Sequence, residues 1–260
     1  MMAPARRSLG RDAAALLGLA VALSACGGEG GGGGGQSEAS RVTVFAASSL
    51  TQAFEAMAEE LEEDSPGTSI RFNFGSSSDL ATQLEQGARA DVYASADEAN
   101  MIRVMDADLV EGEPSVFVKN KLEIIVSAGN PEGIRSLEDL ENSELVLSLC
   151  NEECPAGKYA AEALDKAGVN VEPDSLETEV KAVVTRLQVG EADAGIVYAS
   201  DVASAEGEVE GVPIPAADNV IATYPIAQLT DAESAAGEFV DFALSKRGRA
   251  ILEEHGFLVP

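Results

Sequence analysis

The stretch RVTVFAASSLTQAF, residues 41–54, joins the pattern of a strand to the pattern of a helix. Residues 42–45 are rich in β-branched side chains, which predicts a strand, and from Leu50 to Leu61 the apolar residues recur at helical spacing. Ser48 and Ser49 lie at the junction, and no lysine or arginine follows Arg41 in this stretch. The junction therefore offers hydroxyl groups and helix amides to a ligand, without a positive charge.

The same alternation of short strands and helices continues along the chain. Strand patterns occupy residues 70–74, 92–94, 122–126, 145–149 and 195–198, and helix patterns begin at Ser77, Pro155 and Val180. Alternation of this kind predicts an α/β fold in which helices cover parallel sheets. In such sheets, ligands bind beyond the carboxyl ends of the strands, where helices begin.

The N-terminal region is typical of an export signal. Three arginines precede an apolar run at residues 13–23 that is too short to span a bilayer, and LSAC at residues 23–26 matches a lipoprotein cleavage site. We predict a signal peptide over residues 1–25, a lipidated Cys26 and a flexible glycine-rich tether over residues 26–40. The alternative is an ordinary signal peptide followed by a chance cysteine. The prediction places the folded part on the extracytoplasmic face of the cell membrane, held there by lipid.

The chain is strongly acidic. Its formal net charge is -28, and removal of the signal peptide takes away a net +2, which leaves -30. This charge argues against nucleic acid as a partner and against electrostatic docking on anionic lipid, because both require basic residues. It suits an exported protein that must stay in solution, and we expect a monomer.

Two further cysteines remain, Cys150 and Cys154. In an exported chain such a pair is most simply a disulfide, here closing a tight loop that would contribute about 2 kcal/mol of stability in the loop-entropy model. A redox or metal site is the alternative, but no other cysteine is available to complete a metal site after Cys26 is lipidated.

Four predicted strand-to-helix corners share one chemistry. They lie at Ser48-Ser49, at Ser76-Ser77-Ser78, at Pro155-Ala156-Gly157 and at Thr178-Glu179-Val180. Each presents backbone N–H groups that have no acceptor within the helix, together with the positive end of the helix dipole. Converging corners can hold an anion without lysine or arginine, provided that nearly every ligand oxygen finds a donor.

Each of these features also has a purely structural explanation. Ser49 begins a capping-box pattern, and Ser77 could equally cap its own helix. Pro155 is common in a first helical turn. Tyr198, near the end of a strand, is typical of a half-buried core tyrosine.

No catalytic arrangement competes with a binding site. The serine run at residues 76–78 lacks the glycines of a nucleophile elbow, and His255 is expected to help end the terminal helix. An extracellular enzyme with Ser49 or Ser77 as its nucleophile would lack a base. We therefore predict a protein that is not an enzyme and that has no cofactor and no metal site of its own.

Six short motifs, taken in order, resemble the molybdate-binding proteins of ABC importers, the ModA family. They are VFAASSLT at 44–51, FGSSSDL at 74–80, ADVYASAD at 90–97, PAGKYA at 155–160, GIVYASD at 195–201 and GF at 256–257. The resemblance covers essentially residues 41–260. It implies a two-lobed, type II periplasmic-binding-protein-like fold, in which each lobe is a mixed, mostly parallel sheet flanked by helices and two crossovers form a hinge.

The resemblance also implies the boundaries of the lobes and the residues of the site. Lobe one would comprise residues 41–120 and 224–260, and lobe two residues 121–223. Molybdate would lie between the lobes, bound by the hydroxyls of Ser49 and Ser77, the backbone amides of Ala156 and Val180, and the phenol of Tyr198. The family usually has alanine where Ser48 stands, so this chain has two adjacent serines at the corner and either could be the contact. Ser48 is therefore a further candidate, although alignment on Leu50 favours Ser49.

The implied function is capture of molybdate, and of tungstate, for delivery to the permease of an ABC importer. A site made only of donors rejects phosphate, whose proton needs an acceptor, whereas sulfate must be separated by the size of the cleft. A receptor for sulfate or another small oxyanion is therefore the alternative within this class. A surface adhesin or structural lipoprotein without a small ligand is the alternative outside it. A disulfide between Cys150 and Cys154, absent from many relatives, would hold the Ala156 amide in place.

Overall fold

The structure is a computed structural model that describes residues 40–205 and 207–259, all of which belong to one compact unit. The predicted signal peptide, the predicted lipidation site Cys26 and the tether up to residue 39 lie outside the described residues. Ser40, predicted as the last residue of the tether, instead begins the first strand. Within the described ranges, every helix is too short or too polar to cross a membrane.

Strands and helices alternate along the chain, as the sequence predicts. The strands are β1 (Ser40–Ala47), β2 (Thr68–Gly75), β3 (Val92–Ala94), β4 (Ser115–Ser127), β5 (Leu147–Cys150), β6 (Ser175–Glu177), β7 (Ala194–Tyr198), β8 (Val209–Pro213) and β9 (Ile221–Gln228). The α-helices are α1 (Thr51–Asp64), α2 (Ser77–Glu85), α3 (Glu98–Asp106), α4 (Pro155–Ala167), α5 (Val180–Gln188), α6 (Ala199–Ser204), α7 (Ala236–Leu244) and α8 (Lys246–Glu254). Two short 3-10 helices are η1 (Ser48–Leu50) and η2 (Leu137–Glu141).

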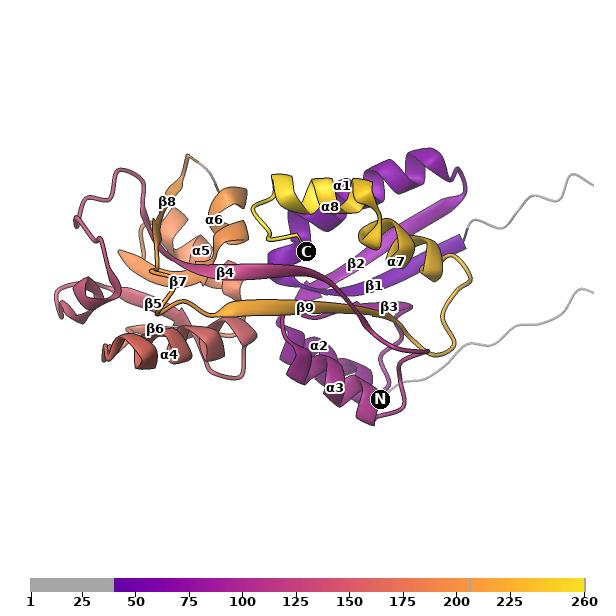
Figure 1. The fold of residues 1–260 in the computed structure, drawn as a ribbon, viewed down its shortest axis with the longest axis horizontal. Coiled ribbons are helices and arrows are strands. Elements are labelled where there is room, and N and C mark those ends of the chain that lie inside the picture. Colours follow the sequence, from indigo (N-terminus) through magenta and orange to yellow (C-terminus); the bar gives the residue numbers. More distant parts are fainter. Residues whose placement is uncertain (1–39, 206, 260) are drawn as a thin grey trace, which may run out of the picture. The chain divides into compact units, whose positions relative to one another are not determined.

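The strands form two mixed groups that share β4 (Figure 1). In the first group, β1 pairs in parallel with β2 and β3, and β3 pairs antiparallel with β9. In the second group, β5 pairs in parallel with β6 and β7, and β4 pairs antiparallel with β7 and β8. The parallel pairs come from the strand–helix alternation of the sequence, and every antiparallel pair includes β4 or β9.

The long strands β4 and β9 lie side by side and pass from one group to the other (Figure 1). Residues 115–121 of β4 pair with β9, and residues 122–126 pair with β7. The sequence predicts a strand only over residues 122–126, because the first half of β4 is recognisable only through its pairing with β9. These two strands are the crossovers that the two-lobed fold requires.

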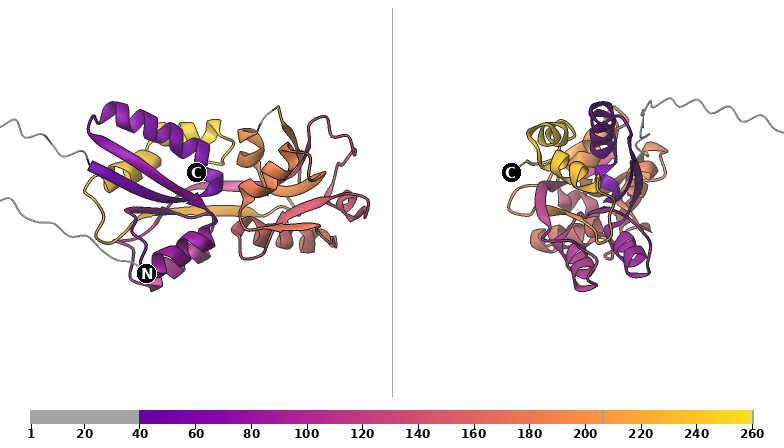
Figure 2. Two further views of the ribbon diagram at one scale, coloured as in Figure 1. Left: turned by 180° about the vertical axis from the view of Figure 1, so that it is seen from behind. Right: turned by 90° about the vertical axis from the view of Figure 1, so that its right-hand side faces the viewer.

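Helices cover both faces of the first group of strands (Figures 1 and 2). Helices α1, α7 and α8 pack together on one face, and α2 and α3 pack together on the other. The aromatic ring of Phe54 on α1 lies 5.2 Å from that of Phe239 on α7 and 5.8 Å from that of Phe117 on β4. Burial of such large apolar side chains stabilises the contact of α1 with the sheet.

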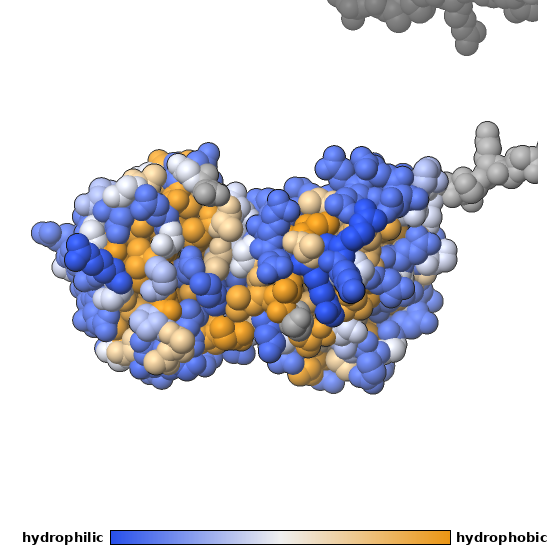
Figure 3. Space-filling model, turned by 45° about the horizontal axis from the view of Figure 1, so that its top comes forward, coloured by the Kyte–Doolittle hydropathy of each residue, from blue (hydrophilic) through white to orange (hydrophobic). Residues whose placement is uncertain are grey.

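In the second group, α4 and α5 both pack on β5 and β7, and α6 packs on β4, β7 and β8. Hydrophobic residues on the face shown in Figure 3 form patches that are interrupted by hydrophilic side chains.

The strand pairing and the helix packing together give the α/β, two-lobed architecture that the sequence predicts. Helices α1, α2, α4 and α5 each begin close to the end of a strand.

Candidate functional site

The four predicted corners meet around one small cavity. Its volume is about 10 Å³, and a cavity needs about that much, by the same measure, to hold a single water molecule. The lining residues are Ala47, Ser48, Ser49, Gly75, Ser76, Ser77, Ala96, Cys154, Pro155, Ala156, Val180 and Tyr198. In this conformation the cavity therefore has room for about one water molecule and excludes a sugar or a peptide.

The first corner follows β1, where the chain forms the 3-10 helix η1 before α1 begins. Helix α1 has no side-chain cap, so the capping-box explanation of Ser49 is wrong. The hydroxyl of Ser49 is instead hydrogen-bonded to the phenol of Tyr224 on β9, with 3.0 Å between the oxygens. Ser49 is buried, and this long-range hydrogen bond fixes its hydroxyl at the cavity wall.

The second corner follows β2 and begins α2. The N-cap of α2 is Ser76, not Ser77, and the helix has no side-chain cap, so the cap explanation of Ser77 is also wrong. The hydroxyl oxygen of Ser77 accepts a hydrogen bond from the Ala96 amide at 2.9 Å, which leaves the Ser77 hydroxyl hydrogen free to be donated. Two lining residues that the sequence analysis did not single out for binding, Ser76 and Ala96, therefore lie beside a predicted one.

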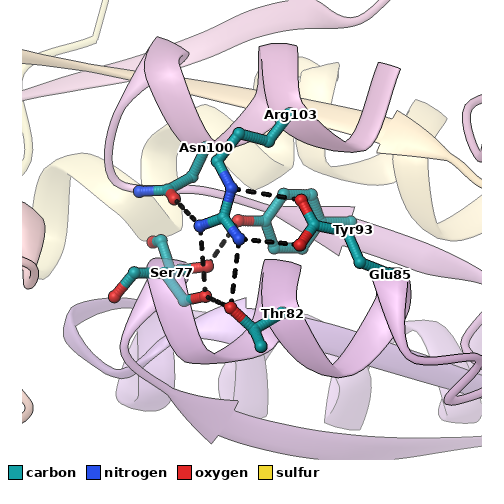
Figure 4. Close-up of polar contacts among 7 residues, drawn as sticks. Ser77, Thr82, Glu85, Tyr93, Asn100 and Arg103 are labelled. Atoms are coloured by element: carbon teal, nitrogen blue, oxygen red, sulfur yellow. Dashed lines mark hydrogen bonds and ion pairs between the residues drawn. The ribbon is translucent and has the colours of Figure 1, made fainter. Parts of the chain in front are cut away.

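The backbone of Ser77 is held by a buried tyrosine (Figure 4). The phenol of Tyr93 donates to the Ser77 carbonyl at 2.9 Å. Next to it, the Arg103 guanidinium on α3 donates to Thr82 and pairs with Glu85, both on α2. These contacts tie α2 to α3 and restrict the movement of the corner that carries Ser77.

The third corner begins α4. Pro155 is in the first turn, and the amides of Ala156 and Gly157 follow it. A β-carbon on Gly157 would lie 2.0 Å from the Asn151 carbonyl oxygen, so only glycine permits this close approach. The start of α4 is therefore seated directly against the loop that precedes it, with Ala156 at the cavity.

Cys150 and Cys154 flank this loop as two buried thiols. Their sulfur atoms lie 2.9 Å apart, which is longer than the roughly 2.05 Å of a disulfide bond. The structure thus contains two thiols in contact and does not show the predicted disulfide. The contact with Cys150 and the hydrogen bonds from the Gly157 and Ala156 amides lower the pKa of Cys154, whereas the contact with Cys154 and burial raise the pKa of Cys150.

The fourth corner begins α5 at Val180. Its N-cap, Glu179, makes no side-chain capping hydrogen bond, so the first amides of α5 have no acceptor within the helix. Burial raises the pKa of Glu179, and the charge of Asp79 on α2 raises it further. Glu179 and Asp79 are acidic neighbours of the cavity, but neither lines it.

Tyr198 lies at the end of β7, and its side chain is only 1% exposed. Its phenolic oxygen is buried and has no hydrogen-bond partner among residues 40–205 and 207–259. Its ring packs edge-to-face on that of Tyr224, with 5.8 Å between the centroids. Burial raises the pKa of Tyr198 well above its usual value, so the phenol keeps its proton and remains a donor.

The cavity brings together every residue that the sequence predicts for the site: Ser48, Ser49, Ser77, Ala156, Val180 and Tyr198. The part of the chain that the structure describes contributes no charged side chain to the lining. Hydroxyl groups and helix amides dominate the polar surface, and no carboxylate is present among these lining residues to accept a proton. An arrangement of this kind binds a small, fully deprotonated anion.

Comparison with known proteins identifies the family of the chain. Residues 42–258 match the family described as bacterial extracellular solute-binding protein. The molybdate-binding protein ModA of Mycobacterium tuberculosis is 41% identical over 84% of this chain and 85% of its own length. ModA of Haemophilus influenzae is 31% identical over 84% of this chain and 89% of its own length.

Among solved structures, the periplasmic molybdate-binding protein of Azotobacter vinelandii superposes with a TM-score of 0.74 over 84% of this chain and 99% of its own. At 19% identity, this likeness concerns the fold alone. Proteins of this family bind solutes for transport and are not enzymes, so the enzyme alternative is excluded. The chain belongs to the family of bacterial extracellular solute-binding proteins and, within it, to the ModA group.

Proposed function

We propose that this protein captures molybdate, and also tungstate, outside the membrane and delivers it to the permease of an ABC importer. The observation that carries the proposal is the buried phenol of Tyr198, a donor that has no partner among the described residues and lines a cavity of hydroxyls and helix amides. The names of the mycobacterial and Haemophilus relatives support the choice of ligand. A dianion would satisfy the phenol and the amides together.

In the proposed complex, the hydroxyls of Ser49 and Ser77 donate from one wall of the cavity. The amides of Ala156 and Val180 and the phenol of Tyr198 donate from the other. Phosphate near neutral pH carries a proton that needs an acceptor, and an unsatisfied donor in a buried site costs about 1–3 kcal/mol. Molybdate and tungstate are fully deprotonated there and incur no such cost.

The two walls belong to the two lobes whose boundaries we propose within the shared strands. Lobe one comprises residues 41–120 and 224–260, and lobe two residues 121–223. The change of partner in β4, from β9 before Leu122 to β7 after it, supports the first boundary. A hinge at this point would let the lobes separate to admit the anion and close around it.

We further propose that the chain is exported by a signal peptide, anchored through a lipid on Cys26, and monomeric. A Cys26→Ser variant should be released from the cells in soluble form, while the unaltered chain stays in the membrane fraction. Release of both forms would contradict lipid anchoring. Size-exclusion chromatography with light scattering measures the molar mass in solution, and the mass of a dimer would contradict the proposed monomer.

We also propose that the buried thiols of Cys150 and Cys154 are oxidised to a disulfide in the exported protein. Their separation of 2.9 Å and their burial support this, because a small movement would bring them to bonding distance. The bond would close a short loop next to the Ala156 amide. Alkylation under denaturing conditions, with and without reduction, tests it: thiols that react without reduction would disprove the bond.

Calorimetry of the full-length protein in detergent, titrated with molybdate, tungstate, sulfate and phosphate, tests the central proposal. We expect tight binding of molybdate and tungstate and no heat from phosphate. Because the chain has four tyrosines and no tryptophan, the ultraviolet difference spectrum should report contact of the anion with Tyr198. Sulfate binding that exceeds molybdate binding would establish the alternative function, a receptor for a smaller oxyanion.

A further inference from the structure

The two walls of the cavity are also joined by one pair of side chains outside it. Lys181 is the second residue of α5, and its ammonium nitrogen lies 3.0 Å from the side-chain oxygen of Gln52 on α1. This hydrogen bond joins the half with β1–β3 to the half with β5–β8 without involving the crossover strands β4 and β9. Neither residue lines the cavity.

The same ammonium group faces a buried carboxylate. Lys181 Nζ lies 3.5 Å from Oδ1 of Asp201, whose side chain is fully buried, while the side chain of Lys181 is 22% exposed. The other oxygen of Asp201 accepts a hydrogen bond from the Tyr198 amide at 3.2 Å. Burial raises the pKa of Asp201 and the charge of Lys181 lowers it. The ammonium group of Lys181 is thus paired with Asp201, and neither residue lines the cavity.

The neighbouring residue works against closure of the two walls. Glu179 precedes α5; burial and the charge of Asp79 on α2, in the opposite wall, raise its pKa, and the charge of Lys181 lowers it. Like charges that approach each other across a cleft favour its opening. The hydrogen bond from Lys181 to Gln52 is the attractive contact of the same helical turn, and it offsets this repulsion.

We propose that Lys181 is a positioning residue that holds the lobes together over the bound anion, by donating to Gln52 while it neutralises Asp201. This inference rests on the proposed function. Because the anion can leave only after the walls separate, Lys181 sets the rate of dissociation and has little influence on association. It does so without touching the ligand, and the anion itself is bound by neutral donors.

Stopped-flow tyrosine fluorescence of the full-length protein with molybdate separates the two rates. Loss of a hydrogen bond to a charged, partly exposed donor predicts roughly 5- to 30-fold faster dissociation in Lys181→Met, with an unchanged association rate. Gln52→Leu removes only the contact between the walls, so its dissociation should be faster by a smaller factor, roughly 2- to 10-fold. Lys158→Met is the matched control. Lys158 is exposed in the first turns of α4, and its substitution removes the same charge near the cavity.

Two double variants identify the mechanism. Lys181→Met with Gln52→Leu should dissociate no faster than Lys181→Met alone, because both changes break one contact. Lys181→Met with Asp201→Asn removes the unpaired buried charge, so its rate should fall back to that of Gln52→Leu. A Lys181→Met protein whose rates equal those of Lys158→Met, or whose association slows as much as its dissociation accelerates, would overturn the proposal.

The failure of the proposed function would look different. In that case, the tyrosine fluorescence of the wild-type protein would not change with molybdate. The contact of Lys181 with Gln52 can then be tested without ligand. A double-mutant cycle of Lys181→Met and Gln52→Leu on the free energy of unfolding should show coupling between the two residues. Additive effects would mean that the walls are not held by this pair, and the inference would fall independently of the ligand.

Discussion

The two walls of the cavity differ in how far their donors are already engaged. In the wall formed by β1 and β2, the hydroxyl of Ser49 is bonded to Tyr224, and that of Ser77 accepts from the Ala96 amide. In the opposite wall, the phenol of Tyr198 has no partner among the described residues, and the first amides of α5 have no acceptor in their helix. The hydroxyl oxygens of Ser49 and Ser77 are therefore already held by the protein, whereas the phenol of Tyr198 is left for the ligand.

This difference separates two kinds of substitution. A change in the first wall breaks a hydrogen bond that stabilises the folded protein, so it should lower stability and affinity together. Loss of the Tyr198 phenol in the second wall removes a donor that has no partner among the described residues, so it should lower affinity and leave stability unchanged. Measurement of the unfolding free energy and of the dissociation constant for the same variants distinguishes the two.

The largest expected effect comes from placing a carboxylate in the second wall. In Ala156→Asp, the new side chain would occupy the cavity and accept hydrogen bonds from the donors meant for the ligand. We expect molybdate binding to weaken by roughly a thousandfold or more, because a like charge in a buried site is strongly repulsive. Calorimetry measures the loss, and circular dichroism confirms the fold.

The matched control is Ala161→Asp, which places the same charge on α4 at a residue that does not line the cavity. It should bind molybdate about as well as the wild-type protein. If Ala156→Asp retains affinity within about tenfold of this control, then the cavity is not the binding site.

Tyr198→Phe tests the second wall with the smallest possible change. Loss of a hydrogen bond to a charged ligand should weaken binding by roughly 1–3 kcal/mol. The free energy of unfolding should not fall, because the phenol has no partner to lose among the described residues. Tyr159→Phe, in a half-buried tyrosine of α4 outside the lining, is the control. Wild-type affinity in Tyr198→Phe would show that Tyr198 is not part of the site.

Ser49→Ala tests the first wall. It leaves the phenol of Tyr224 without its partner in a buried position, so the unfolding free energy should fall by about 1–2 kcal/mol and the affinity should fall with it. Ser48→Ala is the comparison, because Ser48 also lines the cavity. A greater loss of affinity in Ser48→Ala than in Ser49→Ala would show that the assignment of Ser49 is wrong.

The same contrast explains which parts of the site could be predicted from the sequence. The corner at α4 is coded locally: Pro155 occupies the first turn, and Gly168 ends the helix in a left-handed conformation. The helix predicted to begin at Pro155 therefore agrees with the start of α4, and the predicted strand over residues 92–94 agrees with β3. All six candidate residues lie at the cavity because parallel strands end at one edge and their helices begin there.

Long-range contacts could not be predicted in this way. The partner of Ser49 is Tyr224, 175 residues away, and the local pattern around Ser49 instead suggested a capping box. The contact of Lys181 with Gln52 joins residues 129 positions apart, and no local pattern distinguishes either from a solvated side chain. Likewise, the first half of β4 and all of β9 depend on pairing with each other and not on their own periodicity.

The smallest expected effect concerns neither wall but the approach of the anion. The exported chain would carry about -30 charges, derived from the -28 of the full sequence. At low ionic strength this field repels a dianion, and screening shortens its range from about 30 Å at 0.01 M salt to about 8 Å at 0.15 M. The donors of both walls act at contact distance and are screened much less. Added salt should therefore speed association by roughly two- to tenfold and leave dissociation unchanged, as stopped-flow mixing can measure. An association rate that falls with salt would mean that a positive region guides the anion to the cavity, which would contradict a site built from neutral donors.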